Sequence, residues 1–278
     1  MRKFNYYYPT LGKSWMLVLS LLAGAIVFGM LIGALRMFPC KLWEYRTFEY
    51  ILTMITPLAV IAVGAGKAYR KAPVTGALPV KIDAPDFGRF GTFEFFAAAG
   101  LTMLCFAIVI EPLTGLIPMS DYWKKVFEEA FVNTTLPDMV LSACILAPLC
   151  EEFLCRGIIL RGILVTTASP RKAIFWSAFI FAFIHLNPWQ AIPAFLIGLL
   201  FGWIYYRTGS LWATIFLHCL NNSVSTALSR TVDGAGVDTM LKDVLPTNEY
   251  SVLYGAAAVI FAAGIVILHK KMSHISKF

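Results

Sequence analysis

The stretch MVLSACILAPLCEEFLCRGIIL, residues 139–160, is an apolar segment interrupted by charge. It is long enough to cross a bilayer, which takes about 20 residues. Its two adjacent acids, Glu151 and Glu152, are the only acidic residues between Asp138 and Asp233. A carboxylate at the centre of a span costs roughly 2.5 to 3.5 kcal/mol on insertion scales, so two in a row predict a partner or a function. Arg156 follows Glu152 by one helical turn and can supply part of the compensation.

Composition places the chain among polytopic membrane proteins. Hydrophobic residues make up 59% of its 278 residues and charged residues 14%, outside the range of ordinary soluble domains. The net charge is +7, but the basic residues gather in short segments between apolar runs, which indicates membrane topology rather than nucleic-acid binding. The six cysteines form no CxxC pair, so we expect neither a disulfide framework nor a cysteine zinc site.

Apolar segments of suitable length predict an all-α, polytopic membrane helix bundle with about eight transmembrane helices. The turn-forming residues Asn187, Pro188 and Trp189 predict a tight hairpin between the fifth and sixth spans. Residues 121–131 mix charges with aromatic residues and are compatible with an interfacial helix or with a plain loop. The predicted spans are 15–35, 50–66, 92–117, 139–160, 173–186, 190–206, 210–229 and 251–269.

Charge predicts the orientation of these spans. The N-terminal tail, residues 67–90, residues 156–172 and the C-terminal tail are rich in basic residues, whereas 111–138 and 230–249 are rich in acids. Eight spans with both termini in the cytoplasm put the strongly basic segments on one side. Simple loops and the lack of organellar signals favour a bacterial inner membrane.

Two pairs of glycines have the spacing GxxxG, which permits helices to approach closely. They are Gly29 with Gly33 in the first span and Gly198 with Gly202 in the sixth. We expect both pairs to lie in helix contacts.

Polar residues in three spans are expected to reach similar depth. Glu151 and His185 lie roughly 21 Å from the predicted cytoplasmic ends of their spans, and His218 roughly 15 Å, at a rise of ~1.5 Å per residue. A histidine taken singly is more commonly a hydrogen-bonded core residue, but a shared depth indicates one site inside the bundle. The groups are Glu151, Glu152 and Arg156 in the fourth span, Phe181 and His185 in the fifth, and His218 and Asn222 in the seventh.

These groups suit the attack of water on an amide. A carboxylate in a cavity can act as general base, and imidazole can orient the water, donate to an oxyanion or bind a metal. A carboxamide such as Asn222 can donate to an oxyanion without titrating. No serine or cysteine nucleophile is needed.

The motifs that hold these residues resemble those of the CAAX prenyl endopeptidase and bacteriocin-processing family of intramembrane proteases. Residues 151–157 match EExxxRG, residues 181–185 match FxxxH and residues 218–222 match HxxxN. The resemblance covers roughly residues 137–230, and one departure is Cys155, where relatives often have an aromatic residue. It implies that Glu151 activates water with help from His185, that His218 and Asn222 stabilise the oxyanion or complete the site, and that Glu152 and Arg156 give structural or electrostatic support.

The resemblance also suggests how the chain is divided and what it acts on. Residues 1–136 are expected to form N-terminal transmembrane helices and loops, 137–230 a protease core, and 231–278 an outer loop, a last span and a basic tail. Family precedents for substrates are a prenylated C-terminus, a leader peptide and other membrane proteins. The expected partners are therefore the lipid bilayer and a peptide or membrane protein, with no nucleic acid.

Whether a metal takes part is open at this level. Glu151, His185 and His218 could bind zinc with an open position for water. There is no HExxH motif, and a metal-independent glutamate mechanism is slightly favoured.

Other interpretations remain. Glu152 and Arg156 alone could be a structural ion pair, and Pro148 could kink the fourth span or be an ordinary membrane proline. For the whole chain, the alternatives are a proton-coupled transporter and a non-catalytic membrane scaffold.

Overall fold

A computed structural model describes residues 2–38, 41–131, 134–231 and 239–272. Every element in these ranges is helical, which confirms the all-α class. Residues 232–238 of the predicted outer loop and 273–278 of the basic tail lie outside the described residues. The longer helices are α1 (Leu11–Leu35), α2 (Arg46–Thr75), α3 (Thr92–Thr114), α4 (Asp121–Phe131), α8 (Pro170–Phe183), α9 (Pro188–Thr208), α10 (Leu211–Thr231) and α12 (Thr247–Lys271).

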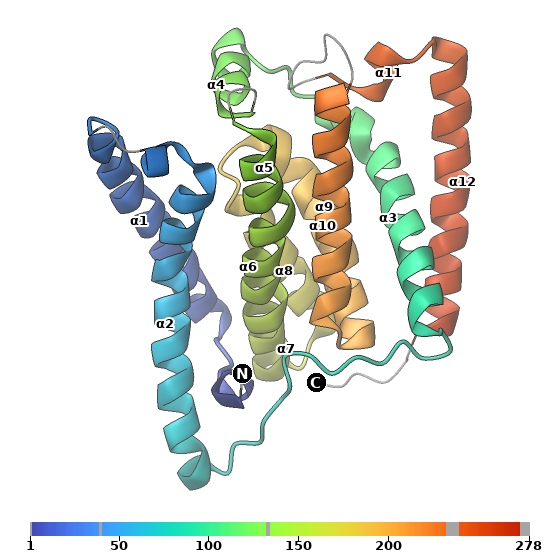
Figure 1. Cartoon of the computed structure of the whole chain (residues 1–278). Coiled ribbons are helices and arrows are strands. Elements are labelled where there is room, and N and C mark those ends of the chain that lie inside the picture. The colour runs from blue at the N-terminus through green and yellow to red at the C-terminus, as the bar shows by residue number, and fades with distance from the viewer. Residues whose placement is uncertain (1, 39–40, 132–133, 232–238, 273–278) are drawn as a thin grey trace.

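The fourth predicted span is one continuous helical rod, Leu136–Thr167, which we call the central helix. It consists of α5 (Leu136–Met139), the π-helical segment η3 (Val140–Leu146), α6 (Ala147–Glu152), the π-helical segment η4 (Phe153–Leu160) and α7 (Arg161–Thr167). Figure 1 shows the pair α1–α2 on one side of it and the pair α3–α12 on the other. The first turn of α1 and the last turn of α12 lie at the same end of the bundle.

Each predicted span coincides with a helix, and the surface confirms a polytopic membrane protein. Five helices, α1, α2, α3, α9 and α12, are long and apolar enough to cross a membrane. In α12 only 11% of the most apolar window is buried inside the protein, so its apolar side chains face outward, as lipid contact requires. A count of eight full crossings stays a prediction, because α8 has 14 residues against the ~20 that a bilayer takes.

Residues 121–131 form helix α4, which decides the choice between helix and loop.

The expected hairpin between the fifth and sixth predicted spans is also present. Helix α8 ends at Phe183, and Asn187 caps α9 by accepting a hydrogen bond from the backbone N–H of Gln190 at 2.8 Å.

The predicted glycine contacts are half right. A Cβ on Gly198 would lie 3.2 Å from Ala178, and one on Gly202 would lie 3.2 Å from Ile174, so this pair lies against α8. A Cβ on Gly29 or Gly33 would meet no described atom within 4 Å, so that prediction was wrong.

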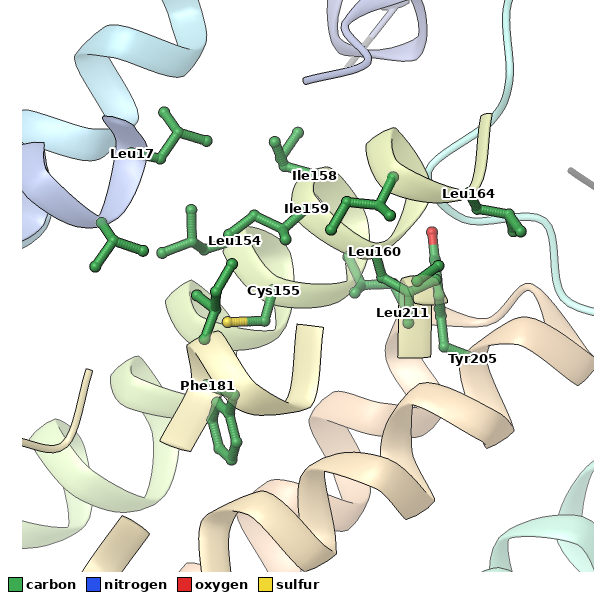
Figure 2. Packing of buried hydrophobic residues seen from close by; sticks show 14 of the residues in the cluster. Leu17, Leu154, Cys155, Ile158, Ile159, Leu160, Leu164, Phe181, Tyr205 and Leu211 are labelled. Carbon is green, nitrogen blue, oxygen red and sulfur yellow. The ribbon is translucent and has the colours of Figure 1, made fainter. Parts of the chain in front are cut away.

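Segment η4 forms the centre of the apolar core. Its side chains, among them Cys155 and Ile158, pack against Leu17 of α1, Phe181 of α8 and Leu211 of α10 (Figure 2). Cys155, the departure from the family motif, is fully buried here. The core therefore joins the central helix to helices on both sides of it.

Two of the four basic residues of 156–172 are buried inside the protein, which corrects their use as topology signals. Arg156 and Arg161 are fully buried. The guanidinium group of Arg161 is satisfied by backbone carbonyl groups, which tie the N-terminal segment and the stretch before α3 to the central helix. The accepting residues are Gly157, Phe4, Tyr7 and Val80.

Asp138 joins the central helix to the start of α2. Its carboxylate accepts hydrogen bonds from the backbone N–H groups of Arg46 at 2.8 Å and Thr47 at 3.0 Å. Tyr45, the residue before α2, gives no side-chain cap, so Asp138 supplies the cap from another helix. Burial acts to raise the pKa of Asp138, but the hydrogen bonds from Thr47 and Arg46 outweigh it and hold the pKa below its usual value. The contact fixes the register of α2 against the central helix.

Candidate active site

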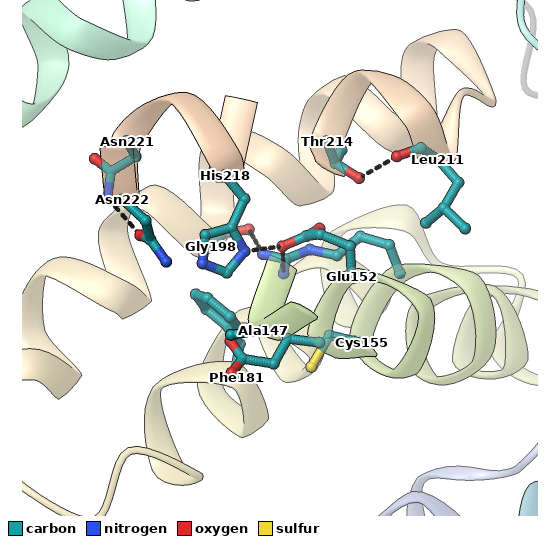
Figure 3. Close-up of polar contacts among 12 residues, drawn as sticks. Ala147, Glu152, Cys155, Phe181, Gly198, Leu211, Thr214, His218, Asn221 and Asn222 are labelled. Carbon is teal, nitrogen blue, oxygen red and sulfur yellow. Dashed lines mark hydrogen bonds and ion pairs between the residues drawn. The ribbon is translucent and has the colours of Figure 1, made fainter. Parts of the chain in front are cut away.

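A buried network surrounds Glu152. Its Oε1 accepts hydrogen bonds from Nη1 of Arg156 at 2.8 Å and from Nδ1 of His218 at 3.0 Å (Figure 3). Nη2 of Arg156 donates to the carbonyl oxygen of Gly198 at 3.1 Å. The side chains of Glu152 and Arg156 are both 0% exposed. This network therefore joins three elements, the central helix, α9 and α10.

Phe181 brings the cation and the two histidines of the predicted site to one aromatic ring. The guanidinium carbon of Arg156 lies 4.5 Å from the centroid of the Phe181 ring, a cation–π distance. The rings of His185 and His218 lie edge-on to it at centroid distances of 5.2 and 5.4 Å. Phe181, the first residue of the FxxxH motif, therefore contacts all three of these groups.

Glu151 faces a different neighbour. Its Oε1 accepts a hydrogen bond from the hydroxyl of Tyr50 on α2 at 3.3 Å. Consecutive helical side chains diverge by about 100°, so the fully buried Glu152 turns towards α10 and the half-buried Glu151 towards α2. Within the described residues no hydrogen bond joins Glu151 to His185, His218 or Asn222. The structure therefore brings together Glu152, Arg156 and His218, with Glu151 beside them.

His185 lies in the turn after α8. Its Nδ1 lies 2.8 Å from the carbonyl oxygen of Phe181. Because a carbonyl oxygen only accepts, Nδ1 carries the proton, and Nε2 of the neutral ring is left as an acceptor. Leu186, the next residue, has a φ of 56°, a left-handed conformation that turns the chain towards α9. The turn holds the imidazole in a fixed tautomer.

Asn222 docks on the central helix. Its Nδ2 donates to the carbonyl oxygen of Ala143 at 2.8 Å. At the end of η3 the N–H of Ala147 bonds to the carbonyl of Ser142, five residues back. The next bond of that ladder would run from residue 148 to Ala143, but Pro148 has no N–H. Asn222 thus supplies the donor that Pro148 lacks, and the helix continues through the proline.

The hydrogen bond of Asn222 predicts that the effects of substitutions at Asn222 and Pro148 on stability are coupled. Asn222→Ala should lower the free energy of unfolding by about 1 kcal/mol, because the Ala143 carbonyl loses its partner. In a Pro148→Ala background the same change should cost less, since residue 148 regains an N–H. Thermal unfolding of the four proteins in detergent measures the coupling.

An equal cost of Asn222→Ala in both backgrounds would contradict this assignment. The second N–H of the Asn222 amide is not used in this bond, so a catalytic contribution of Asn222 would appear as loss of turnover in both backgrounds.

The candidate zinc ligands are not gathered. Among the residues that the structure describes, no three His, Cys, Asp or Glu side chains are grouped so that they could hold a metal ion. The Nδ1 atoms of His185 and His218 bond to Phe181 and Glu152, and Glu151 bonds to Tyr50. This arrangement does not fit the predicted set of Glu151, His185 and His218, and a metalloprotease is not supported.

Two partners in the site could not be found by motif reasoning. Tyr50 lies about a hundred residues before Glu151, and the Gly198 carbonyl belongs to the backbone, so neither leaves a local pattern. The π-helical segments on both sides of Glu151 and Glu152 give no periodicity that distinguishes them from α-helix over so few residues. Such segments are common at functional sites in helices.

Comparison with known proteins finds one family model that matches part of the chain. Residues 133–224 match a family model described as Type II CAAX prenyl endopeptidase Rce1-like. The matched segment contains all six predicted site residues. No curated protein and no solved structure matches the chain.

Proposed function

Since the chain belongs, through residues 133–224, to the CAAX prenyl endopeptidase and bacteriocin-processing family, we propose that it hydrolyses a peptide bond within the membrane by direct attack of water. The proposal is supported by a fixed polar network, Glu152–Arg156–His218, that lies one residue from the half-buried carboxylate of Glu151. Buried charges in a membrane bundle are costly, and here those of Glu152 and Arg156 are paired with each other. Glu151 lies outside this pair and is therefore the carboxylate that can react with water.

Glu151 is the general base in this proposal. It takes a proton from water while the water oxygen forms a bond to the substrate carbonyl carbon. Nε2 of His185, which is an acceptor in the tautomer set by Phe181, orients that water. When the C–N bond breaks, the proton held by Glu151 passes to the leaving amine. The glutamate is thereby regenerated without a covalent intermediate.

His218 and Asn222 serve the oxyanion that forms on the carbonyl oxygen. Nδ1 of His218 donates to Glu152, so its Nε2 can donate to an oxyanion only in the imidazolium form. The free N–H of Asn222 supplies a second donor. Glu152 and Arg156 hold His218 in place from the central helix.

The substrate is a peptide or membrane protein with a segment in the bilayer. The name of the matched family suggests a prenylated C-terminus, and a leader peptide or another membrane protein is compatible with the same chemistry. We place the protein in a bacterial inner membrane with both termini cytoplasmic. The first turn of α1 and the last turn of α12 share one end of the bundle in Figure 1, which supports an even number of crossings.

The test is a cleavage assay with the full chain in liposomes. Peptides with a prenylated C-terminal CAAX sequence and unmodified membrane peptides are incubated with the protein, and products are identified by mass spectrometry. We expect new peptide termini and, with added hydroxylamine, no peptide hydroxamate, because water attacks directly. A hydroxamate product would show an acyl-enzyme and contradict the mechanism.

Two further arms address the alternatives. Turnover should be retained in protein that elemental analysis shows to be metal-free. Loss on chelation that zinc restores would overturn the glutamate mechanism. Proton flux into the liposomes without any cleavage would favour a transporter, and a folded protein with neither activity would favour a scaffold.

A further inference from the structure

Tyr50 of α2 contacts the turn of the central helix that carries Glu151. Its hydroxyl lies 3.3 Å from Oε1 of Glu151 and 3.5 Å from the carbonyl oxygen of Ala147, one helical turn earlier. Both neighbours accept, so the tyrosine hydroxyl is the donor. Helix α2 lies outside the segment that matches the family model.

The position of Tyr50 is set by a second contact between the same two helices. Asp138 caps the first residues of α2, Arg46 and Thr47, one turn before Tyr50. On the central helix Asp138 likewise precedes Glu151, so the two helices run in the same direction along this contact. Two polar contacts on one helix pair fix both rotation and translation of α2. The packing of α2 on the central helix therefore determines that the Tyr50 hydroxyl lies next to Glu151.

We propose that Tyr50 is a positioning residue of the active site, whose hydroxyl holds the Glu151 carboxylate in one orientation. The inference rests on the proposed function, in which Glu151 is the base. It extends the site to a helix that the family motifs do not include. A hydrogen bond to a carboxylate favours the charged form, which is the form that accepts a proton from water.

Removal of the hydroxyl should therefore change how cleavage depends on pH. In Tyr50→Phe the acid limb of the kcat/KM profile should move to higher pH by about one unit, with little change on the plateau above it. The other titratable and charged groups near Glu151 are the same in wild type and in Tyr50→Phe, so a shift of the acid limb reports the lost hydroxyl. On the elements packed around this turn these groups are Arg46 and Glu49 of α2, Cys150, Glu152, Cys155 and Arg156 of the central helix, His218 of α10 and His185 after α8.

The experiment compares wild type, Tyr50→Phe and Tyr45→Phe in liposomes, with cleavage of one peptide measured from acid to neutral pH. Tyr45 is the matched control, because it precedes α2, is 46% exposed and loses the same single hydroxyl. A shift in Tyr50→Phe alone is the expected result. Fewer folded molecules would lower the whole profile without moving its limb, so a structural effect is distinguishable.

A second variant tests the same bond from the other side. Replacing Tyr50 by 3-fluorotyrosine keeps the ring and makes the hydroxyl a stronger donor, so the acid limb should move to lower pH. If neither change moves the limb while Glu151→Gln abolishes turnover, the inference about Tyr50 is wrong and the proposed function stands. If Glu151→Gln retains turnover, the proposed base itself is wrong.

Discussion

Glu151→Gln is expected to lower peptide cleavage by about 10²- to 10⁴-fold, the usual contribution of a general base, while the protein folds and inserts as wild type does. Glutamine keeps the shape and can still accept the hydrogen bond from Tyr50, but it cannot take a proton from water. Because Glu151 is half-buried and outside the Glu152–Arg156 pair, its neutralisation strands no buried partner. Cleavage in liposomes, with thermal unfolding as the folding check, measures the effect.

Glu128→Gln is the matched control for this change. Glu128 is exposed on α4, and its substitution removes one carboxylate outside the site. Turnover of Glu128→Gln should equal that of wild type. Cleavage by Glu151→Gln at more than about a tenth of the wild-type rate would remove Glu151 as the base, given the size of general-base effects.

Much of the helical arrangement follows from sequence because it depends on local properties. Runs of apolar residues place every long helix except α4, and Asn187 with Pro188 marks the turn between α8 and α9. The Glu152–Arg156 pair follows from a spacing of four on a helix, where side chains share a face. These features need only the periodicity of one segment, which the sequence shows directly.

The division of labour between the two adjacent acids depends on neighbours that are distant in the chain. Spacing shows that Glu151 and Glu152 point in different directions, but not which of them meets α10 and which meets α2. That choice depends on how the helices rotate in the bundle, which Asp138 and Asn222 help to fix through contacts across the chain. The spacing of Gly29 and Gly33 misled for the same reason, since a GxxxG pair favours a contact but does not supply the facing helix.

Arg156→Met is expected to give the largest loss of stability of any change in the site. Glu152 and Arg156 are both 0% exposed, and breaking a buried pair by removing one partner typically costs about 3–5 kcal/mol, because the other charge is left uncompensated. The change also removes the hydrogen bond to the Gly198 carbonyl and the cation–π contact with Phe181. Thermal unfolding in detergent should show a large fall in the transition temperature.

The double variant Glu152→Gln with Arg156→Met separates charge from packing. It removes both charges at once, and the amide oxygen of the new side chain can still accept the hydrogen bond from Nδ1 of His218. If the uncompensated carboxylate is the cause, the double variant should be more stable than Arg156→Met alone. A double variant that is less stable by the full cost of a second change would show that Glu152 is not held by Arg156, and that the arginine acts through Phe181 and Gly198 instead. In the first outcome His218 would stay in place, although it loses a charged partner in the double variant. The loss of transition-state stabilisation, taken from the fall in turnover, would then be smaller than the loss in the free energy of unfolding.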